Sequence, residues 1–389
     1  MNMKKIIYTI GIALLAAIVL PSTAQVSNDN EDEVNKISPR FSRQDYVPGQ
    51  ILVKFKDTNR ITIHRSRGKF TSTSVDGITK ILKKYCADEI EQLLPNQKPR
   101  RTLARTRAYN GETIEEHDLS QLYCIKLSSE HQLETEQAID EFKALDEVEF
   151  AEPNYRVYAM ADTHIADNYN DNPMVSQQWY LDSYGVKELW NKPIINKERP
   201  IIAILDTGVD INHPDLKDNI WTNLVEAYGQ NDTDNDGNGF KNDVHGYDFI
   251  NNTGEIRDNN MHGTHVAGIA AASNNNMGII GANPQALIMP ITVLQSNGAG
   301  DVGTIIKGID YAAANGAKVI NMSFGVYYNS VALRQSLETA YTQAVLVAAA
   351  GNDGRCINEL HWGTKHFPPE LQSMSMFPAA YSFVLGIQV

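Results

Sequence analysis

The stretch that decides the fold of this chain runs from Arg199 to Ser273, opening with RPIIAILDTGVDINHPDL and closing with NMHGTHVAGIAAAS. The apolar run Ile201–Leu205 is unbroken, which predicts a parallel strand, covered on both faces, that delivers Asp206 into a Thr-Gly turn. The second half predicts a helix with His262 in its first turn, and its small, uncharged residues indicate that this helix is buried. A carboxylate at a strand end and an imidazole at a helix start favour an Asp–His pair. In such a pair the carboxylate orients the imidazole, which acts as a general base toward an attacking hydroxyl.

Other interpretations of these residues stay open on the pattern alone. An Asp at a strand end is usually a turn or cap residue. The DTG sequence also fits a pepsin-type aspartic protease, but that chemistry needs a second carboxylate, and no second DTG or DSG occurs. His262 and His265 have HxxH spacing, yet the Glu of the zinc motif H-E-x-x-H is missing.

Together and in this order, AILDTGVDINHPDL and HGTHVAGIAA resemble the Asp and His motifs of the subtilisin-like serine proteases, the subtilase family. The resemblance implies a secreted serine endopeptidase that hydrolyses peptide bonds through an Asp-His-Ser triad. In that scheme Asp206 orients His262, which acts as general base and then as general acid. Asn352, in AAAGN, would donate its side-chain amide to the oxyanion, although a Gly-Asn pair alone is usually a turn.

The resemblance also implies where substrate binds. VINMSFG, residues 319–325, resembles the substrate strand of the family, and residues 298–300 (Gly-Ala-Gly) resemble the opposing strand. Together they would hold an extended polypeptide by backbone hydrogen bonds, with a preference for apolar side chains. The Met and Phe in this segment fit plain core packing equally well. The substrate-binding residues implied in this way are Gly298, Gly300, Ser323, Phe324, Gly325, Ala350 and Gly351.

The acidic stretch NDTDNDGNGFKND matches the start of a calcium-binding loop, D-x-[DN]-x-[DN]-G, with an Asp in the twelfth place. The alternative is a solvated loop, but so many carboxylates would repel one another without a cation, which favours structural Ca²⁺. The family resemblance implies a second calcium site that uses the segment SNNNMGI. The candidate metal ligands are Asp232, Asp234, Asp236, Asn238 and Asp243 in the loop, and Asp215 and Asn275 at the second site.

Composition and the N-terminus indicate export. The chain has 389 residues and a net charge of −13, which leaves room for two domains and disfavours nucleic acid as a partner. Lys4 and Lys5 precede the apolar run Ile6–Leu20 and a small-residue exit at Ala24, which predicts a signal peptide too short to span a membrane. We expect a periplasmic, cell-surface or extracellular protein without a membrane span in its mature form.

Three cysteines are too few for a disulfide scaffold. Cys124, in LYCIKL, is expected to be a small buried hydrophobe, and a Cys86–Cys124 bond stays open.

The predicted organisation is a signal peptide (1–24), a disordered linker (25–45), a small α+β domain (46–160) and a peptidase domain (161–389). In the α+β domain, PGQILVKFK, QLYCIKL and VEFAEPNYRVYA predict strands, Ile78–Leu94 and Leu133–Leu145 predict helices, and the basic KPRRTLARTR is taken as a loop rather than a processing site. This domain resembles the inhibitory propeptide of subtilases, which implies that its tail lies in the active site until it is cut near Tyr158–Asp167.

Beyond Asp206, strands alternate with helices, which predicts an α/β fold with a parallel sheet covered by helices on both faces. Ligands of such sheets bind at the carboxyl ends of the strands, where Asp206 and Asn352 both fall. The elements expected are strands at 286–294, 318–322 and 345–350, helices at 302–314 and 331–342, and a further strand in MFPAAYSFVLGIQV.

The third motif of the family, a Gly-Thr-Ser-Met-Ala-like stretch, is absent, because every Gly-Thr here is followed by His, Ile or Lys. Two hypotheses follow: a fragment of a serine endopeptidase whose Ser lies outside the printed sequence, or a non-catalytic, peptide-binding pseudoprotease that ends at Val389. Ser323 is disfavoured as a nucleophile because it falls in the substrate strand. Since a triad acts as a unit, we expect the 389-residue polypeptide itself to be inactive.

Overall fold

The structure is a computed structural model that describes residues 46–56, 60–66, 69–87, 89–97, 103–159, 174–190, 199–352 and 375–387. The predicted signal peptide and linker lie outside these residues, as do Cys356 and the segment that follows Ala159. In the part of the chain that is described, no helix is both long and apolar enough to cross a membrane.

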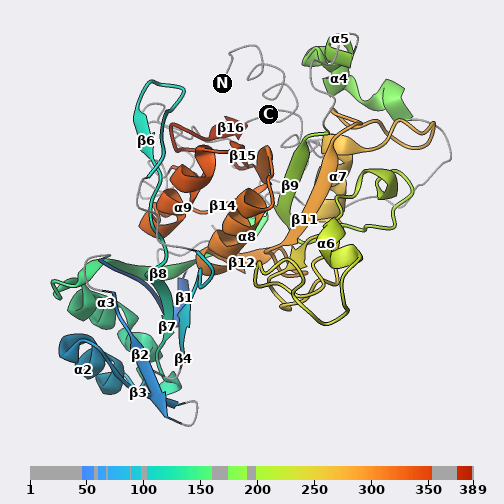
Figure 1. Ribbon diagram of the computed structural model, residues 1–389. Coiled ribbons are helices and arrows are strands. Elements are labelled where there is room, and N and C mark those ends of the chain that lie inside the picture. The colour runs from blue at the N-terminus through green and yellow to red at the C-terminus, as the bar shows by residue number, and fades with distance from the viewer. Residues whose placement is uncertain are drawn as a thin grey trace, which may run out of the picture.

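A six-stranded parallel sheet organises the C-terminal lobe, residues 199–387 (Figure 1). Its strand order is β10-β11-β9-β13-β15-β16, and every neighbouring pair is parallel. The central strands are buried almost throughout, which explains why their sequences are unbroken apolar runs. The bounds are β9 Ile201–Asp206, β10 Tyr247–Asp248, β11 Leu287–Thr292, β13 Val319–Met322, β15 Val345–Ala349 and β16 Leu385–Ile387.

Helices cover both faces of this sheet, as predicted. On one face α7 (His262–Ala271) packs its small residues in a cluster with Ile202 and Ile204. On the other face α8 (Val302–Ala314) and α9 (Val331–Tyr341) share a core with Leu205 and Met322. The short helices α4 (Trp179–Ser183), α5 (Val186–Trp190) and α6 (Leu224–Ala227) lie outside these layers.

The N-terminal lobe, residues 46–159, has an antiparallel sheet in the order β8-β1-β7-β4. The apolar residues on one face of this sheet form a core with those of two amphipathic helices, whereas those on the other face, such as Leu52 and Leu122, join the core of the C-terminal lobe. The elements are β1 Tyr46–Phe55, β2 Ile63–Ser66, β3 Lys69–Thr73, α2 Asp76–Lys84, β4 Glu89–Gln92, β5 Arg105–Arg107, β6 Thr113–Glu115, β7 Leu122–Lys126, α3 Thr135–Lys143 and β8 Val148–Ala159.

Two local predictions differ from the structure. The helix expected to run to Leu94 ends at Lys84, because Cys86 takes a left-handed conformation (φ 45°) that stops it, and β4 follows. The basic segment expected to be a loop contains β5 in its described part, paired with β6 in a hairpin.

Cys86 and Cys124 are both free thiols, so the bond left open above is absent. Cys124 is buried as expected, and its burial raises the pKa of the thiol to about 12.

Strand β8 connects the two lobes. Its first part pairs with β1 in the N-terminal sheet, whereas its end, from Arg156 to Ala159, pairs antiparallel with β12 (Ala299–Asp301) and β14 (Phe324–Gly325). One strand of twelve residues therefore belongs to the N-terminal sheet and also reaches the C-terminal lobe.

Candidate active site

The structure brings Asp206 and His262 together. Asp206 is the last residue of β9 and fully buried, and His262 is the first residue of α7. The Nδ1 atom of His262 lies 2.7 Å from Oδ1 of Asp206, which also accepts a hydrogen bond from the Thr207 amide at 2.7 Å. The carboxylate therefore fixes the orientation of the imidazole ring.

Asp258 ties the start of α7 to the turn after β9. Its carboxylate accepts hydrogen bonds from the amides of Met261 and Thr264, both at 2.9 Å, and from the Thr207 hydroxyl at 2.9 Å. Met261 has a left-handed backbone (φ 75°), an uncommon conformation for a non-glycine residue. Asp258 was not among the residues predicted from the sequence, although an acid just before a predicted helix is a recognised N-terminal signal.

The residue that follows His262 in α7 is Gly263, because the helix approaches the turn after β9 too closely for a side chain. A Cβ at this position would lie 2.0 Å from the Gly208 carbonyl oxygen and 3.0 Å from Cβ of Asp206. No larger residue fits unless the backbone that holds Asp206 moves away. The spacing of the Asp–His pair thus depends on a glycine.

The electrostatic surroundings of His262 suit a general base. Burial alone would lower its pKa, but the charge of Asp206 and the hydrogen bond to it, together with the charge of Asp258, outweigh burial and raise the pKa. The Nε2 atom is buried, and among the described residues it has no hydrogen-bond partner. A hydroxyl group placed there would meet the basic nitrogen of an oriented imidazole.

The zinc interpretation gains no support from the structure. Burial, and then the charge of His262, lower the pKa of His265. The side chains of the described part of the chain that are spaced to hold a metal ion do not include this pair of histidines.

Strands β12 and β14 hold the end of β8. Gly300 pairs with Val157, and Gly325 pairs with Tyr158. The amide of Ala159 donates to the carbonyl oxygen of Gly298 at 2.8 Å. An extended segment of the same chain therefore lies between β12 and β14.

The remaining residues expected at the substrate site differ in their surroundings. Ser323 is fully buried and accepts a hydrogen bond from Nδ2 of Asn321 at 2.9 Å, and Phe324 is buried in the core. Ala350 donates its amide to Ile387, and Gly351 takes the left-handed backbone (φ 95°) that favours glycine.

Asn352 follows β15 and is exposed. Strands β9, β13 and β15 are parallel neighbours, so Asn352 and Asp206 lie at the same edge of the sheet.

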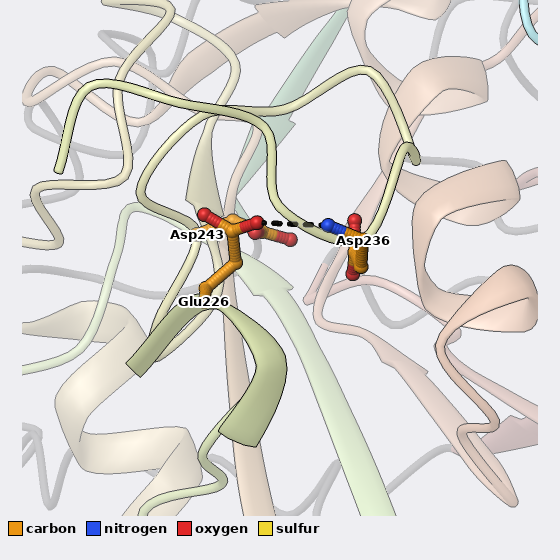
Figure 2. Close-up of side chains that lie close together, drawn as sticks. All are labelled: Glu226, Asp236 and Asp243. Carbon is orange, nitrogen blue, oxygen red and sulfur yellow. Dashed lines mark hydrogen bonds between the residues drawn. The ribbon is translucent and has the colours of Figure 1, made fainter. Parts of the chain in front are cut away.

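The acidic loop contains a compact cluster of carboxylates. Glu226, Asp236 and Asp243 each offer one oxygen, and these oxygens lie within 4.8 Å of one another (Figure 2). Glu226 and Asp243 are buried, and burial, with the charges of Asp236 and Glu226 adding to it, raises the pKa of Asp243. The Nδ2 atom of Asn238 donates to Asp243 at 2.9 Å and to Asp236 at 3.1 Å. Glu226 comes from α6, ahead of the motif, and was therefore not among the predicted ligands.

Asp232 and Asp234, also predicted as ligands, lie outside this cluster. The carboxylate of Asp234 accepts the amides of Gly237 and Gly239, both at 2.8 Å. Oδ1 of Asp232 accepts from the side chain of Asn242 at 3.1 Å. These two residues shape the turns of the loop, because a short Asp side chain readily bonds the backbone nearby.

The second expected metal site has a buried carboxylate. Oδ2 of Asp215 accepts the amide of Ile279 at 3.1 Å, whereas its Oδ1 is buried without a partner among the described residues. The side chain of Asn275 lies next to this segment and donates to the carbonyl oxygen of Pro214 at 3.2 Å.

Residues 197–388 match the Subtilase family, a stretch that contains the whole parallel sheet and the Asp206–His262 pair. The chain contains a subtilase domain. It is 37% identical over 173 residues to "Subtilisin-like protease 1" of Plasmodium falciparum (isolate 3D7), covering 43% of this chain and 25% of that protein. It is also 37% identical over 187 residues to "Thermitase" of Thermoactinomyces vulgaris, covering 48% of this chain and 58% of that protein.

Among solved structures, fervidolysin from Fervidobacterium pennivorans, "a keratinolytic enzyme related to subtilisin", matches with a TM-score of 0.50 and 23% identity. That match covers 80% of this chain and 41% of fervidolysin, and it supports the α/β fold. The chain matches between a quarter and just under three fifths of the length of the two relatives named above.

Proposed function

We propose that the site formed by Asp206 and His262 hydrolyses peptide bonds as a secreted serine endopeptidase. The observation that carries this proposal is the 2.7 Å bond between Oδ1 of Asp206 and Nδ1 of His262, with Nε2 of the same ring buried and unpartnered among the described residues. The nucleophile in this proposal is a serine outside the described residues.

In this mechanism Nε2 of His262 takes the proton of the serine hydroxyl as it attacks the scissile carbonyl, and later gives it to the leaving amine. Asp206 stabilises the imidazolium that forms, and the amide of Asn352 donates to the oxyanion. The backbone of the substrate would lie between β12 and β14, where β8 lies now.

We further propose that the N-terminal lobe is an intramolecular inhibitor. Support comes from the end of β8, which pairs with both strands of the substrate groove and so denies them to another polypeptide. The cut that frees the groove would fall after Ala159, before the C-terminal lobe.

Ca²⁺ is the ion that best fits the acidic cluster, because it takes several carboxylate and carbonyl oxygens in flexible geometry. Glu226, Asp236 and Asp243 would hold it, and the ion would offset the repulsion between these carboxylates. Asp215, whose buried Oδ1 has no partner in the described part of the chain, would contribute to a second site. Both ions would act on stability, not on the chemical step.

The test is hydrolysis of an unfolded protein by the gene product, produced in its own host from the full reading frame. We expect wild-type protein to cleave it and His262→Ala to lose nearly all activity, because triad members act as a unit. A His265→Ala variant serves as the matched control and should keep most of the activity. Equal rates in wild type and His262→Ala would contradict the proposal.

A second candidate function is peptide binding without hydrolysis. It is favoured by the same two strands, which hold an extended segment while no described serine bonds to Nε2 of His262. In the test above, a gene product that binds peptides but cleaves none would establish this alternative.

A further inference from the structure

The N-terminal lobe also touches the C-terminal lobe away from the end of β8. One face of its sheet shares a core with α8 and α9, and the Glu152 carboxylate accepts hydrogen bonds at the start of α9. A further contact is made by a segment that precedes β8. A hairpin formed by β5 and β6, with the chain that leads from it to His117, lies beside α9 (Figure 1). We call residues 103–117 the arm. It is part of the N-terminal lobe in sequence, but its contacts with α9 are separate from the substrate groove.

The arm contacts one face of α9. Arg334, Glu338 and Tyr341 are spaced at i, i+4 and i+7, so they share a face of the helix. Glu338 Oε2 lies 2.6 Å from Nε2 of His117, and the backbone amide of His117 donates to the Thr339 hydroxyl at 2.9 Å. One end of the arm is thus bonded through both its backbone and its side chain.

The tip of the hairpin makes a second set of contacts. The ring of Tyr109 packs edge-on against Tyr341 with 5.8 Å between centroids, and the Tyr341 hydroxyl donates to the Arg107 carbonyl oxygen at 3.2 Å. Glu112 accepts from Ser382 at 2.6 Å and from Arg334 at 3.4 Å.

An apolar contact lies beneath these bonds. Ile114 and Ala108 are buried, and they belong to the same core cluster as Leu337, Ala340 and Phe383 of the C-terminal lobe. Burial of apolar surface, unlike an exposed ion pair, gives a contact that persists in salt.

We propose that the arm is an additional anchor, which together with the sheet face and Glu152 keeps the N-terminal lobe on α9 after the chain is cut behind Ala159. A cut there frees the end of β8 but breaks none of the bonds from the arm to Arg334, Glu338 or Tyr341. Release of the lobe then requires the arm to leave α9. This inference rests on the proposed function. The arm controls when the substrate groove opens only if the N-terminal lobe inhibits the enzyme.

The experiment uses the full chain with a recognition sequence for a specific protease placed within residues 160–173 and a C-terminal tag. After the cut, the C-terminal lobe is held by its tag, and the rate at which the N-terminal lobe washes off is measured. We expect Tyr109→Ala/Glu112→Ala to release it about tenfold faster than wild type. Both side chains are substantially exposed, with Tyr109 at 44%, so the fold of neither lobe should depend on them.

The matched control is Arg105→Ala/Glu115→Ala. These residues form an ion pair at 2.9 Å within the hairpin, and the variant should release the lobe at the wild-type rate. A conservative variant, Glu112→Gln, keeps the side-chain volume, and we expect about threefold faster release. Two results would overturn the proposal. One is release at the wild-type rate by both Tyr109→Ala/Glu112→Ala and Glu112→Gln. The other is release by the control variant as fast as by Tyr109→Ala/Glu112→Ala. The measurement needs no peptidase activity, so its failure is distinct from failure of the proposed function.

Discussion

Nδ1 of His262 is bonded to Oδ1 of Asp206 at 2.7 Å, while Nε2, on the other side of the same ring, has no partner among the described residues. The two nitrogens are therefore in different states. One is committed to a buried carboxylate, and the other can exchange a proton with a group brought to it. This difference is what the proposed role of His262 as a general base requires.

The first prediction concerns the titration of His262. Asp206→Asn removes the charge that raises the pKa of His262 but leaves the ring buried, so the pKa should fall below its ordinary value of 6.5. Nuclear magnetic resonance of labelled histidine side chains measures it directly. Asp210→Asn, an exposed carboxylate on the following turn, is the control and should leave the titration unchanged. An unchanged pKa in Asp206→Asn would show that the carboxylate does not set it.

The second prediction compares two glycines in α7. Gly263→Ala places a Cβ 2.0 Å from a backbone oxygen, so it should cost roughly 2–3 kcal/mol of unfolding free energy. At Gly268 the new Cβ would be 3.4 Å from the tip of the Ile279 side chain, and Ala is the better helix former, so Gly268→Ala should be neutral or stabilise by up to about 1 kcal/mol. Denaturant unfolding gives both values. Equal effects of the two substitutions would mean that the close approach at Gly263 is relieved without cost.

The third prediction separates the carboxylates of the acidic loop. Glu226→Gln removes a charge from the cluster and should weaken calcium binding roughly tenfold or more. Asp232→Asn, which changes a residue outside the cluster, should weaken it by less than about threefold. Isothermal titration calorimetry with calcium chloride on the full chain measures both. Stronger loss in Asp232→Asn than in Glu226→Gln would place the ion elsewhere in the loop.

The fourth prediction is a loosening of the arm at acid pH. Burial alone would raise the pKa of Glu338, but hydrogen bonds from His117 and Arg334 outweigh burial and lower it. A carboxyl with a lowered pKa stabilises the folded contact above its ordinary value of 4.5, and this stabilisation is lost as the pH falls through the lowered value. Release of the cut N-terminal lobe should therefore accelerate below pH 4.5. The change with pH should be smaller in Glu338→Gln, and an identical pH profile in that variant would assign the effect to other carboxylates.

The sequence predicted the parallel sheet well because its strands are buried on both faces and read as continuous apolar runs, such as Ile201–Leu205. It also predicted the Asp–His pair, since both residues sit where an element begins or ends. Contacts between distant segments were harder. Glu226 joins the acidic cluster from α6, and Asp258 joins two turns through its side chain, and neither contact leaves a periodic signal in the sequence.

The arm was missed for a related reason. Its strands are three residues long each, and its charged residues read as a solvated loop. Only the fold shows that Glu112 and His117 face α9.

The most direct test of the central claim is reaction of the protein from its native source with a fluorophosphonate, which labels a serine activated by a neighbouring imidazole. The labelled peptide is then identified by mass spectrometry. We predict a label on one serine outside the residues that the structure describes, and no label when His262 is replaced by Ala. A label on Ser323, or one that persists without His262, would contradict it.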